Sequence, residues 1–236
     1  MSLIGSLYYV PPWFYGYDIA LQFLFGMITL IVSFYAFKLY IISSQRELKL
    51  FSGAFFFISL SYLIWAVLNI FLIDLESSVV GVVEFENFRL LTDSVFGLST
   101  LGVYAHVFFF ITGVLTLAYM NFKVDRPRIY IFLITLVLPV IFFSYNVRLM
   151  TYLIASILFA HLSLFYAKDY LSSKGGRTAL VLLAFVFLFF ASLTFMYSGR
   201  EPISYATGHL LTFVAYILIL VNFIKVLNHG QKKEQA

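Results

Sequence analysis

Histidine has the widest chemical range of the residue types in this chain, and only four histidines occur among its 236 residues. A neutral imidazole inside a protein can bind haem or a metal ion, relay protons, or bond to a neighbouring hydroxyl group, which is its commonest role. Three of the four lie within long apolar segments, and His161 lies only about 10 Å from the basic end of its segment, which leaves the pair His106 and His209. Counted from the basic ends of their segments at 1.5 Å per residue, they lie at similar depths, about 20 and 24 Å. We therefore expect the two rings to lie in one layer.

Other polar and aromatic residues lie at the same depth as His106 and His209, or on the same face of a helix as a residue at that depth. Positions i, i+4, i+7 and i+11 of a helix lie on one stripe, and polar side chains of a membrane-spanning helix usually face the bundle interior. The candidate ligand-binding residues predicted in this way are Gln22, Thr29, Tyr62, Trp65, His106, His209, Thr212 and Tyr216. Close packing of small and hydroxyl residues between helices is the alternative explanation for such stripes, above all for the one from Asp18 to Tyr40.

Several kinds of catalysis are excluded by residue type and spacing. The chain has no Cys, which removes thiolate catalysis, iron–sulfur ligation and Cys-based zinc sites. Neither HExxH nor GxSxG occurs, and Asp93 lies about 20 Å from His106 along one helix, too far to complete a zinc site. We predict no catalytic residue, no metal site and, on balance, no enzymatic activity. No cofactor is expected, although His106 and His209 meet the depth requirement of a bis-histidine haem.

The overall composition indicates a protein whose surroundings are mostly lipid. Hydrophobic residues make up 62% of the chain, aromatic residues 20% and charged residues 11%, and the mean hydropathy is +0.98. A typical soluble domain is about 25% charged. These values exclude a secreted disulfide scaffold, a disordered tail and a nucleic-acid-binding domain. We predict an all-α, multi-pass protein of the cell membrane with the lipid bilayer as its main partner; the composition also suits an archaeal protein.

Seven segments are apolar over the roughly 20 residues that a transmembrane helix needs. They are Tyr17–Ile42, Leu48–Ile73, Leu90–Met120, Ile129–Tyr145, Leu149–Tyr170, Ala179–Tyr197 and Ile203–Leu227. The aromatic stretch from Tyr8 to Tyr15 is typical of an anchor at the membrane interface. The longest predicted loop, Asp74–Arg89, cannot hold a folded domain. Residues 1–236 are therefore predicted to form a single seven-transmembrane domain.

The distribution of basic residues predicts the orientation of this bundle. With loops assigned to alternate sides, twelve of the 15 Lys and Arg fall on one side, and only Arg89, Arg148 and Arg200 fall on the other. Cytoplasmic loops carry an excess of Lys and Arg. The N-terminus is therefore predicted to lie outside the cell and the C-terminus in the cytoplasm.

The first three and last three segments contain similar short stretches. His106 begins His-Val-Phe-Phe-Phe-Ile, and His209 begins His-Leu-Leu-Thr-Phe-Val. These stretches indicate a parallel repeat of residues 17–123 and 149–227 joined by a helix over 129–145, with chance matching in a Phe-rich chain as the alternative.

This plan of three, one and three helices resembles that of SWEET and PQ-loop transporters and, more distantly, of microbial rhodopsins. The resemblance covers the whole chain as topology only. No Pro-Gln pair occurs in the first or fifth segment, and the seventh has no mid-membrane Lys for a retinal Schiff base, since Lys225 lies at its cytoplasmic end. The resemblance implies a pocket between two half-bundles.

Three functions are compatible with these features. The preferred one is a non-enzymatic sensor, receptor-like protein or binding module that holds a small or lipidic ligand within the bundle and acts through a partner membrane or cytoplasmic protein. The second is a small-solute transporter of the three-plus-one-plus-three type. Against it stand two triplets without proline and the lack of an acidic residue at mid-membrane. The third is a structural or haem-binding subunit of a membrane complex.

Overall fold

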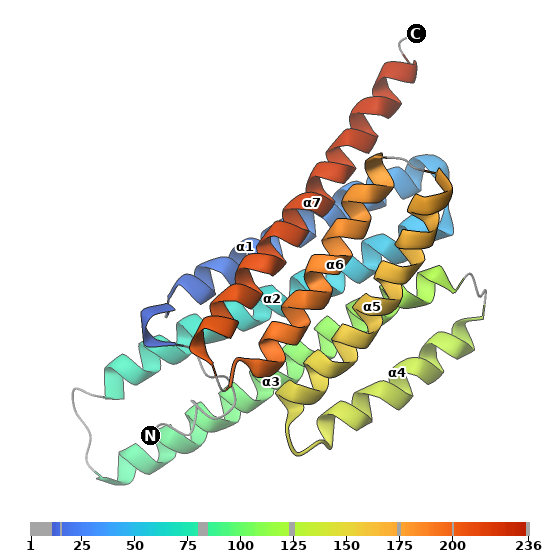
Figure 1. Ribbon diagram of the computed structural model, residues 1–236. Coiled ribbons are helices and arrows are strands. Elements are labelled where there is room, and N and C mark those ends of the chain that lie inside the picture. Colours follow the sequence, from blue (N-terminus) through green and yellow to red (C-terminus); the bar gives the residue numbers. More distant parts are fainter. Residues whose placement is uncertain are drawn as a thin grey trace.

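The computed structural model describes residues 11–14, 16–79, 85–122, 126–173, 176–199 and 201–234, and almost all of these are helical (Figure 1). No strand occurs in these ranges. A short 3-10 turn, η2, precedes seven helices. The elements are η2 (Pro12–Phe14), α1 (Tyr17–Ser43), α2 (Arg46–Val79), α3 (Phe85–Asn121), α4 (Pro127–Phe142), α5 (Val147–Ser173), α6 (Gly176–Tyr197) and α7 (Pro202–Glu234).

Six of the seven described helices are long and apolar enough to cross a membrane. The exception is α4, whose 16 residues include Pro139. At 1.5 Å per residue α4 is about 24 Å long, whereas the hydrocarbon core of a bilayer is about 30 Å thick. The predicted all-α architecture is confirmed over the described residues, and its six long helices are consistent with contact with a lipid bilayer.

The helices are longer than the apolar segments from which they were predicted. The predicted loop Asp74–Arg89 is wrong over most of its length, because α2 continues to Val79 and α3 begins at Phe85. No proline or glycine interrupts the chain between Gly53 and Gly81, and charged or polar residues are compatible with a helix. Apolar composition therefore marks the part of a helix that can lie in lipid, whereas the helix itself continues into more polar sequence.

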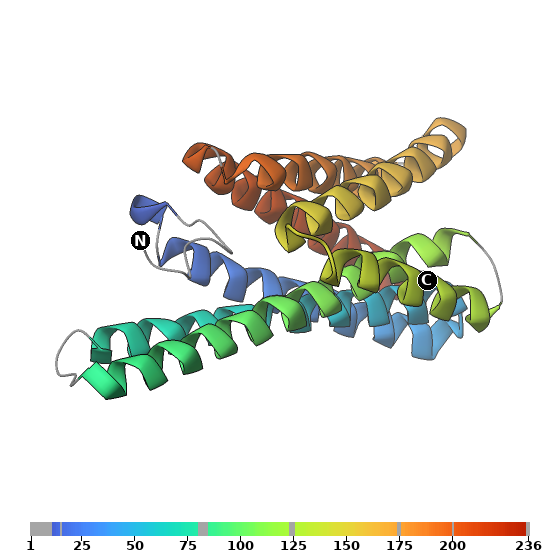
Figure 2. The ribbon, with the colours of Figure 1, turned by 90° about the horizontal axis from the view of Figure 1, so that it is seen from below.

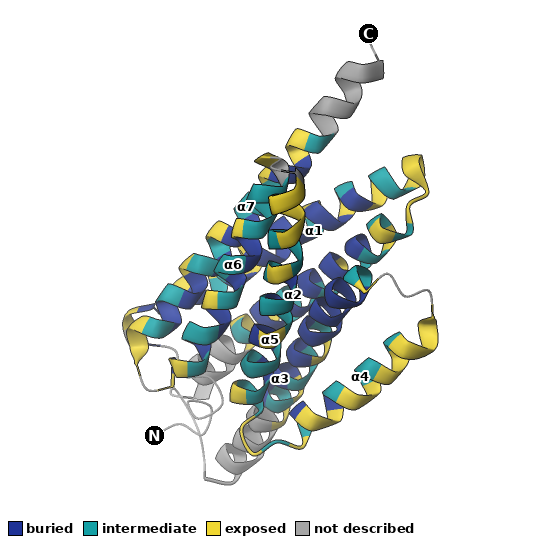
Figure 3. Ribbon diagram, turned by 45° about the vertical axis from the view of Figure 1, so that its right-hand side comes forward, coloured by how far each residue is buried: buried dark blue, intermediate teal, exposed yellow. Residues whose placement is uncertain are grey.

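The six long helices form two layers. Helices α1, α2 and α3 pack side by side, as do α5, α6 and α7, and contacts of α1 with α7 and of α3 with α5 join the layers. Seen from below, the layers cross at an angle and diverge toward one end (Figure 2). Helix α4 packs against α3 and α5, and most of its surface is exposed (Figure 3). The arrangement matches the three, one and three grouping of the helices, while the internal sequence repeat stays a prediction.

Hydroxyl groups hold α1 against α2 along the polar stripe of α1. The Ser33 hydroxyl donates to the carbonyl of Ser52 at 2.9 Å, and the Ser52 hydroxyl donates back to the carbonyl of Ser33 at 3.0 Å. The Ser59 hydroxyl donates to the carbonyl of Gly26 at 2.8 Å. Such bonds and close packing join helices in lipid, where apolar burial gives no net driving force. For this deeper part of the stripe the close-packing alternative is therefore correct.

Candidate ligand pocket

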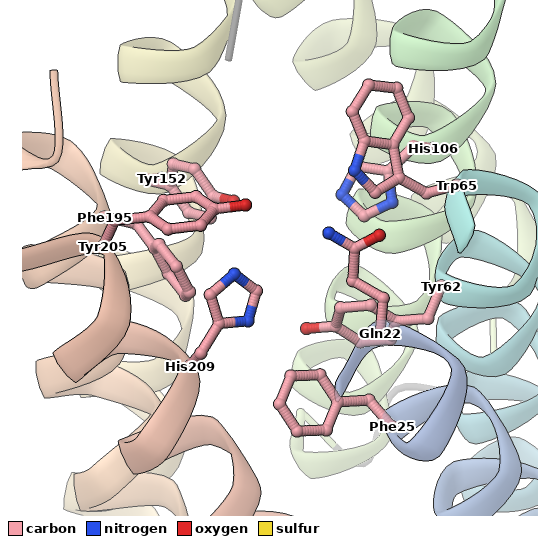
Figure 4. A pocket seen from close by; sticks show the side chains of 9 residues that line it. All are labelled: Gln22, Phe25, Tyr62, Trp65, His106, Tyr152, Phe195, Tyr205 and His209. Atoms are coloured by element: carbon pink, nitrogen blue, oxygen red, sulfur yellow. The ribbon is translucent and has the colours of Figure 1, made fainter. Parts of the chain in front are cut away.

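A pocket lies between the two layers, near the ends of the helices where α5 and α7 begin and α6 ends (Figure 4). Its empty volume is about 330 Å³, counting the space at its open side. Each of the six long helices contributes at least one lining residue. The nine lining residues are Gln22, Phe25, Tyr62, Trp65, His106, Tyr152, Phe195, Tyr205 and His209. The empty volume includes open solvent, and the enclosed part has room for only about one water molecule, so a larger ligand would enter by moving the two layers apart.

The wall of the pocket is aromatic and uncharged. Six of the nine lining residues are Phe, Tyr or Trp, and the other three are Gln22, His106 and His209. In Figure 4 the side chains of α1, α2 and α3 face those of α5, α6 and α7 across the open space. The pocket therefore offers ring surfaces and a few neutral hydrogen-bonding groups from two opposed walls.

His106, which is 6% exposed, is held by Ser61 of the neighbouring α2. The Ser61 hydroxyl donates to the backbone carbonyl of His106 at 2.9 Å, so toward the ring this hydroxyl serves as an acceptor. The ring Nδ1 lies 2.7 Å from that hydroxyl oxygen and 3.2 Å from the Ser61 carbonyl, which is also an acceptor. His106 therefore carries its proton on Nδ1. It fills the commonest of the roles expected for a membrane histidine, a bond to a neighbouring hydroxyl.

His209, which is 4% exposed, has no such support. Within the described part of the chain neither of its ring nitrogens has a hydrogen-bond partner. Four aromatic rings surround it instead, with centroids at 5.6 Å (Phe14), 5.9 Å (Phe25), 5.1 Å (Phe195) and 4.6 Å (Tyr205). A buried polar group without a partner costs about 1–3 kcal/mol. The described residues contain no cluster of three or more His, Cys, Asp or Glu that could hold a metal ion.

Gln22 reaches the pocket from α1 with one half of its amide already bonded. Asn69 of α2 donates to its carbonyl oxygen at 3.1 Å, which leaves the amide nitrogen as the available end. Figure 4 shows this nitrogen pointing toward the open space. Beside it, the Tyr216 hydroxyl donates to the Tyr62 hydroxyl at 3.4 Å.

The segment before α1 contributes to the end of the pocket nearest His209. Phe14, in η2, is buried, and its ring centroid lies 5.9 Å from that of Tyr205. The buried carboxylate of Asp18 accepts hydrogen bonds from the Gly16 N–H at 3.1 Å and from the Tyr205 hydroxyl. The predicted interface anchor is therefore wrong for Phe14, because its ring fills the space beside His209. Trp13 is 59% exposed, and residues 8–10 and 15 lie outside the described part.

The structure brings together five of the eight predicted binding residues. Gln22, Tyr62, Trp65, His106 and His209 all line the pocket.

The other three, Thr29, Thr212 and Tyr216, are buried but do not line the pocket. Tyr216 supports Tyr62, whereas the threonine hydroxyls bond to their own helices. The Thr29 hydroxyl donates to the carbonyl of Phe25 at 2.7 Å, and that of Thr212 donates to the carbonyl of Gly208 at 2.8 Å. Threonine in an apolar helix commonly satisfies its hydroxyl in this way, so sharing a face with His209 did not bring Thr212 to the pocket.

The predicted binding residues did not include Ser61, Phe25, Tyr152, Phe195 or Tyr205. Of these, Tyr205 lies four residues before His209 on the same helical face. Phe25 lies three residues after Gln22, on the buried face of α1, so helical periodicity could have found it. Ser61 is adjacent to Tyr62 but bonds to α3, which periodicity within α2 does not indicate. Tyr152 and Phe195 carry no distinguishing signal among 17 Tyr and 29 Phe.

No protein-family model, curated protein or solved structure matches the chain. The class defined by the fold is a helical, polytopic membrane protein, according to the length and composition of its helices. Any more specific function has to be argued from the pocket.

Proposed function

We propose that this is a non-enzymatic integral protein of the cell membrane that binds one small or lipidic molecule between its two helix layers. In this role it is sensor-like or receptor-like, and a separate membrane or cytoplasmic protein carries the response. The pocket supports this proposal, because it collects side chains from all six long helices and a ligand there would contact both layers at once. If the layers can adopt two conformations that differ in their separation, a molecule that binds one conformation more tightly would shift the equilibrium toward it.

The observation that carries the proposal is the state of His209. Both of its ring nitrogens are buried without a partner in the described residues, and its ring faces the pocket. Buried polar groups in native proteins almost always have a partner, so such a group calls for one that the chain does not supply. A ligand that bonds to His209 would remove this cost and gain affinity from it.

The test is to find which molecules co-purify with the protein and whether they depend on His209. Wild type, His209→Phe and His161→Phe are purified in parallel in a mild detergent, and the small molecules extracted from each are analysed by mass spectrometry. His161 is the matched control because it is also a membrane histidine with a buried, unpartnered ring nitrogen, Nε2, but it does not line the pocket.

We expect a compound near one equivalent per protein in wild type and His161→Phe that is lost from His209→Phe. Identical extracts from all three proteins would mean that only surrounding lipid is carried along, and would refute the proposal.

A small-solute transporter is the second candidate. It is favoured by the position of the pocket at the interface of two three-helix layers, which is where transporters built from two such halves hold their solute. Swelling of proteoliposomes in glycerol, urea and sorbitol, followed by light scattering, would test it. Faster swelling with the wild type than with empty liposomes supports transport. A haem-binding subunit stays a prediction, for which a Soret band in the purified protein is the test.

A further inference from the structure

We propose that the ligand of the pocket is a neutral, planar ring with carbonyl oxygens at opposite edges, which is the chemistry of a quinone headgroup. This inference rests on the proposed binding function and specifies its ligand class. Three features of the pocket support it: the absence of charge in the wall, the ring surfaces of the wall, and hydrogen-bond donors on its two opposed sides.

The wall selects a neutral ligand. None of the nine lining residues is charged. The nearby carboxylate of Asp18 is buried and already accepts hydrogen bonds from Gly16 and Tyr205. Moving an ion into such surroundings without a counter-charge costs far more than moving a neutral group.

The wall also selects a flat ligand. Phe25, Tyr62 and Trp65 present rings from one layer, and Tyr152, Phe195 and Tyr205 present rings from the other. Rings in this wall already contact one another, with Tyr152 and Phe195 stacked at 4.9 Å between centroids. Aromatic side chains favour offset or edge contact with another ring. A planar ring entering between the two layers would extend this arrangement, whereas a branched chain would not.

Two of the polar groups point to acceptor atoms on the ligand. The carbonyl oxygen of Gln22 is occupied by Asn69, so its amide offers N–H donors to the pocket. On the opposite wall the neutral imidazole of His209 has one N–H donor, which has no partner in the described residues. Two donors that face each other across the pocket match a ring with an acceptor oxygen at each edge. An ammonium ligand has N–H donors and no acceptor, so it could not accept a hydrogen bond from the Gln22 amide.

The two tryptophans of the chain allow a direct test. Trp65 lines the pocket and Trp13 is 59% exposed, so Trp13→Phe leaves a single fluorophore beside the proposed ligand. Quinones quench indole fluorescence. We expect menadione to quench Trp13→Phe protein in phosphatidylcholine nanodiscs along a saturable curve. Adding His209→Phe or Gln22→Met should weaken the apparent affinity about three- to tenfold, the usual effect of one lost hydrogen bond. Adding His161→Phe should change nothing.

The reciprocal protein, Trp65→Phe, keeps only Trp13 and reports the quinone dissolved in lipid. We expect its quenching to be linear in menadione. Decylubiquinone, which carries an alkyl tail, is titrated beside menadione, and tighter binding of decylubiquinone would indicate a lipid-borne quinone rather than a free one. Gln22→Met is an independent variant, so the test does not depend on the folding of His209→Phe, which circular dichroism checks.

Linear quenching of Trp65 that is unchanged by both pocket variants would overturn the quinone assignment. A rise in melting temperature with tetraethylammonium, abolished by His209→Phe, would overturn it in favour of a cation. In either case, loss of a co-purified compound from His209→Phe in the extraction experiment would leave the proposed binding function standing. If that loss is also absent, both proposals fail.

Discussion

His106 and His209 share one pocket but differ in what their ring nitrogens contact. Ser61 holds His106 through two groups of one residue, a hydroxyl oxygen and a carbonyl oxygen. His209 has ring contacts only. Ser61 therefore orients one imidazole before any ligand arrives, whereas the orientation of the other depends on packing alone. This division suits a site in which His106 shapes the wall and His209 bonds to the ligand.

The contacts of His106 predict which of its nitrogens carries the proton. Nitrogen NMR of histidine-labelled protein should find the proton of His106 on Nδ1. Ser61→Ala removes the 2.7 Å partner and leaves only the longer contact to the carbonyl, so we expect a mixture of the two tautomers. The unfolding free energy should fall by about 1–3 kcal/mol. Ser163→Ala is the control, because that hydroxyl bonds within its own helix. An unchanged tautomer in Ser61→Ala would show that Ser61 does not set it.

The lining residues that were predictable from sequence are the polar and rare ones. Hydrophilic and interfacial side chains are uncommon within membrane segments, so their presence indicates a structural or functional role. The residues that stand out in this way are His106, His209, Gln22 and Trp65. Phe195 and Tyr152 could not be recognised, since any lipid-facing helix of this chain carries the same residue types. Thr29 and Thr212 were assigned to the pocket because a helical face does not reveal where a hydroxyl proton is directed.

At the scale of the helix, close contact between α2 and α3 depends on a missing side chain. A Cβ atom at Gly113 would lie 2.6 Å from Cγ1 of Ile58 and 2.7 Å from the carbonyl oxygen of Ala54. A backbone oxygen cannot move aside as a side chain can. Since α2 carries Tyr62 and Trp65 and α3 carries His106, this contact also positions one wall of the pocket.

Gly113→Ala should therefore separate α2 from α3, and we expect it to lower the unfolding free energy by about 1–3 kcal/mol, as for an overpacked core. Gly97→Ala on the same helix is the matched control, because an added Cβ meets nothing within 4 Å there. Alanine is a better helix former than glycine, so Gly97→Ala should be stabilising by about 0.5–1 kcal/mol. Equal effects at the two positions, measured by denaturant unfolding in detergent, would contradict the close contact.

The two faces of helix α4 differ in how far their side chains are buried. Ile141 is fully buried in the main apolar core, whereas Phe132 is 64% exposed. Ile141→Ala should lower the unfolding free energy by about 2–5 kcal/mol through the cavity it leaves. Phe132→Ala should cost far less, because lipid or detergent fills the vacated space. Similar losses for the two variants would mean that α4 is covered on its outer face in the folded protein.

The positions of the helices were predictable from sequence, while their ends and partners were less so. Long apolar runs identify the six long helices because lipid leaves the backbone no other way to satisfy its hydrogen bonds. The ends of α2 and α3 lie beyond the apolar residues, where hydropathy no longer reports on structure. Which helices share a layer depends on small residues such as Gly113, and their contacts are visible only in three dimensions.

For the whole molecule, α4 decides how the chain is arranged across the membrane. If α4 crosses, the two termini lie on opposite sides, and the Lys and Arg divide twelve against three. If it does not cross, every loop after it changes side and the division becomes eight against seven. Only the first division has the strong bias typical of membrane proteins. We therefore expect α4 to cross in spite of its length, with local thinning of the bilayer to match it.

Cysteine labelling tests this arrangement directly, because the chain has no cysteine of its own. Single variants Gln45→Cys, Tyr145→Cys and Glu201→Cys place one thiol in each of the α1–α2, α4–α5 and α6–α7 turns, at residues that are all exposed. A membrane-impermeant maleimide added to intact cells should label positions 145 and 201. Position 45 should react only after permeabilisation. If α4 does not cross, positions 45, 145 and 201 all lie on the same side and share one labelling pattern. That pattern would reverse the α5–α7 layer relative to the α1–α3 layer across the membrane, and would remove the three, one and three plan on which the transporter alternative rests.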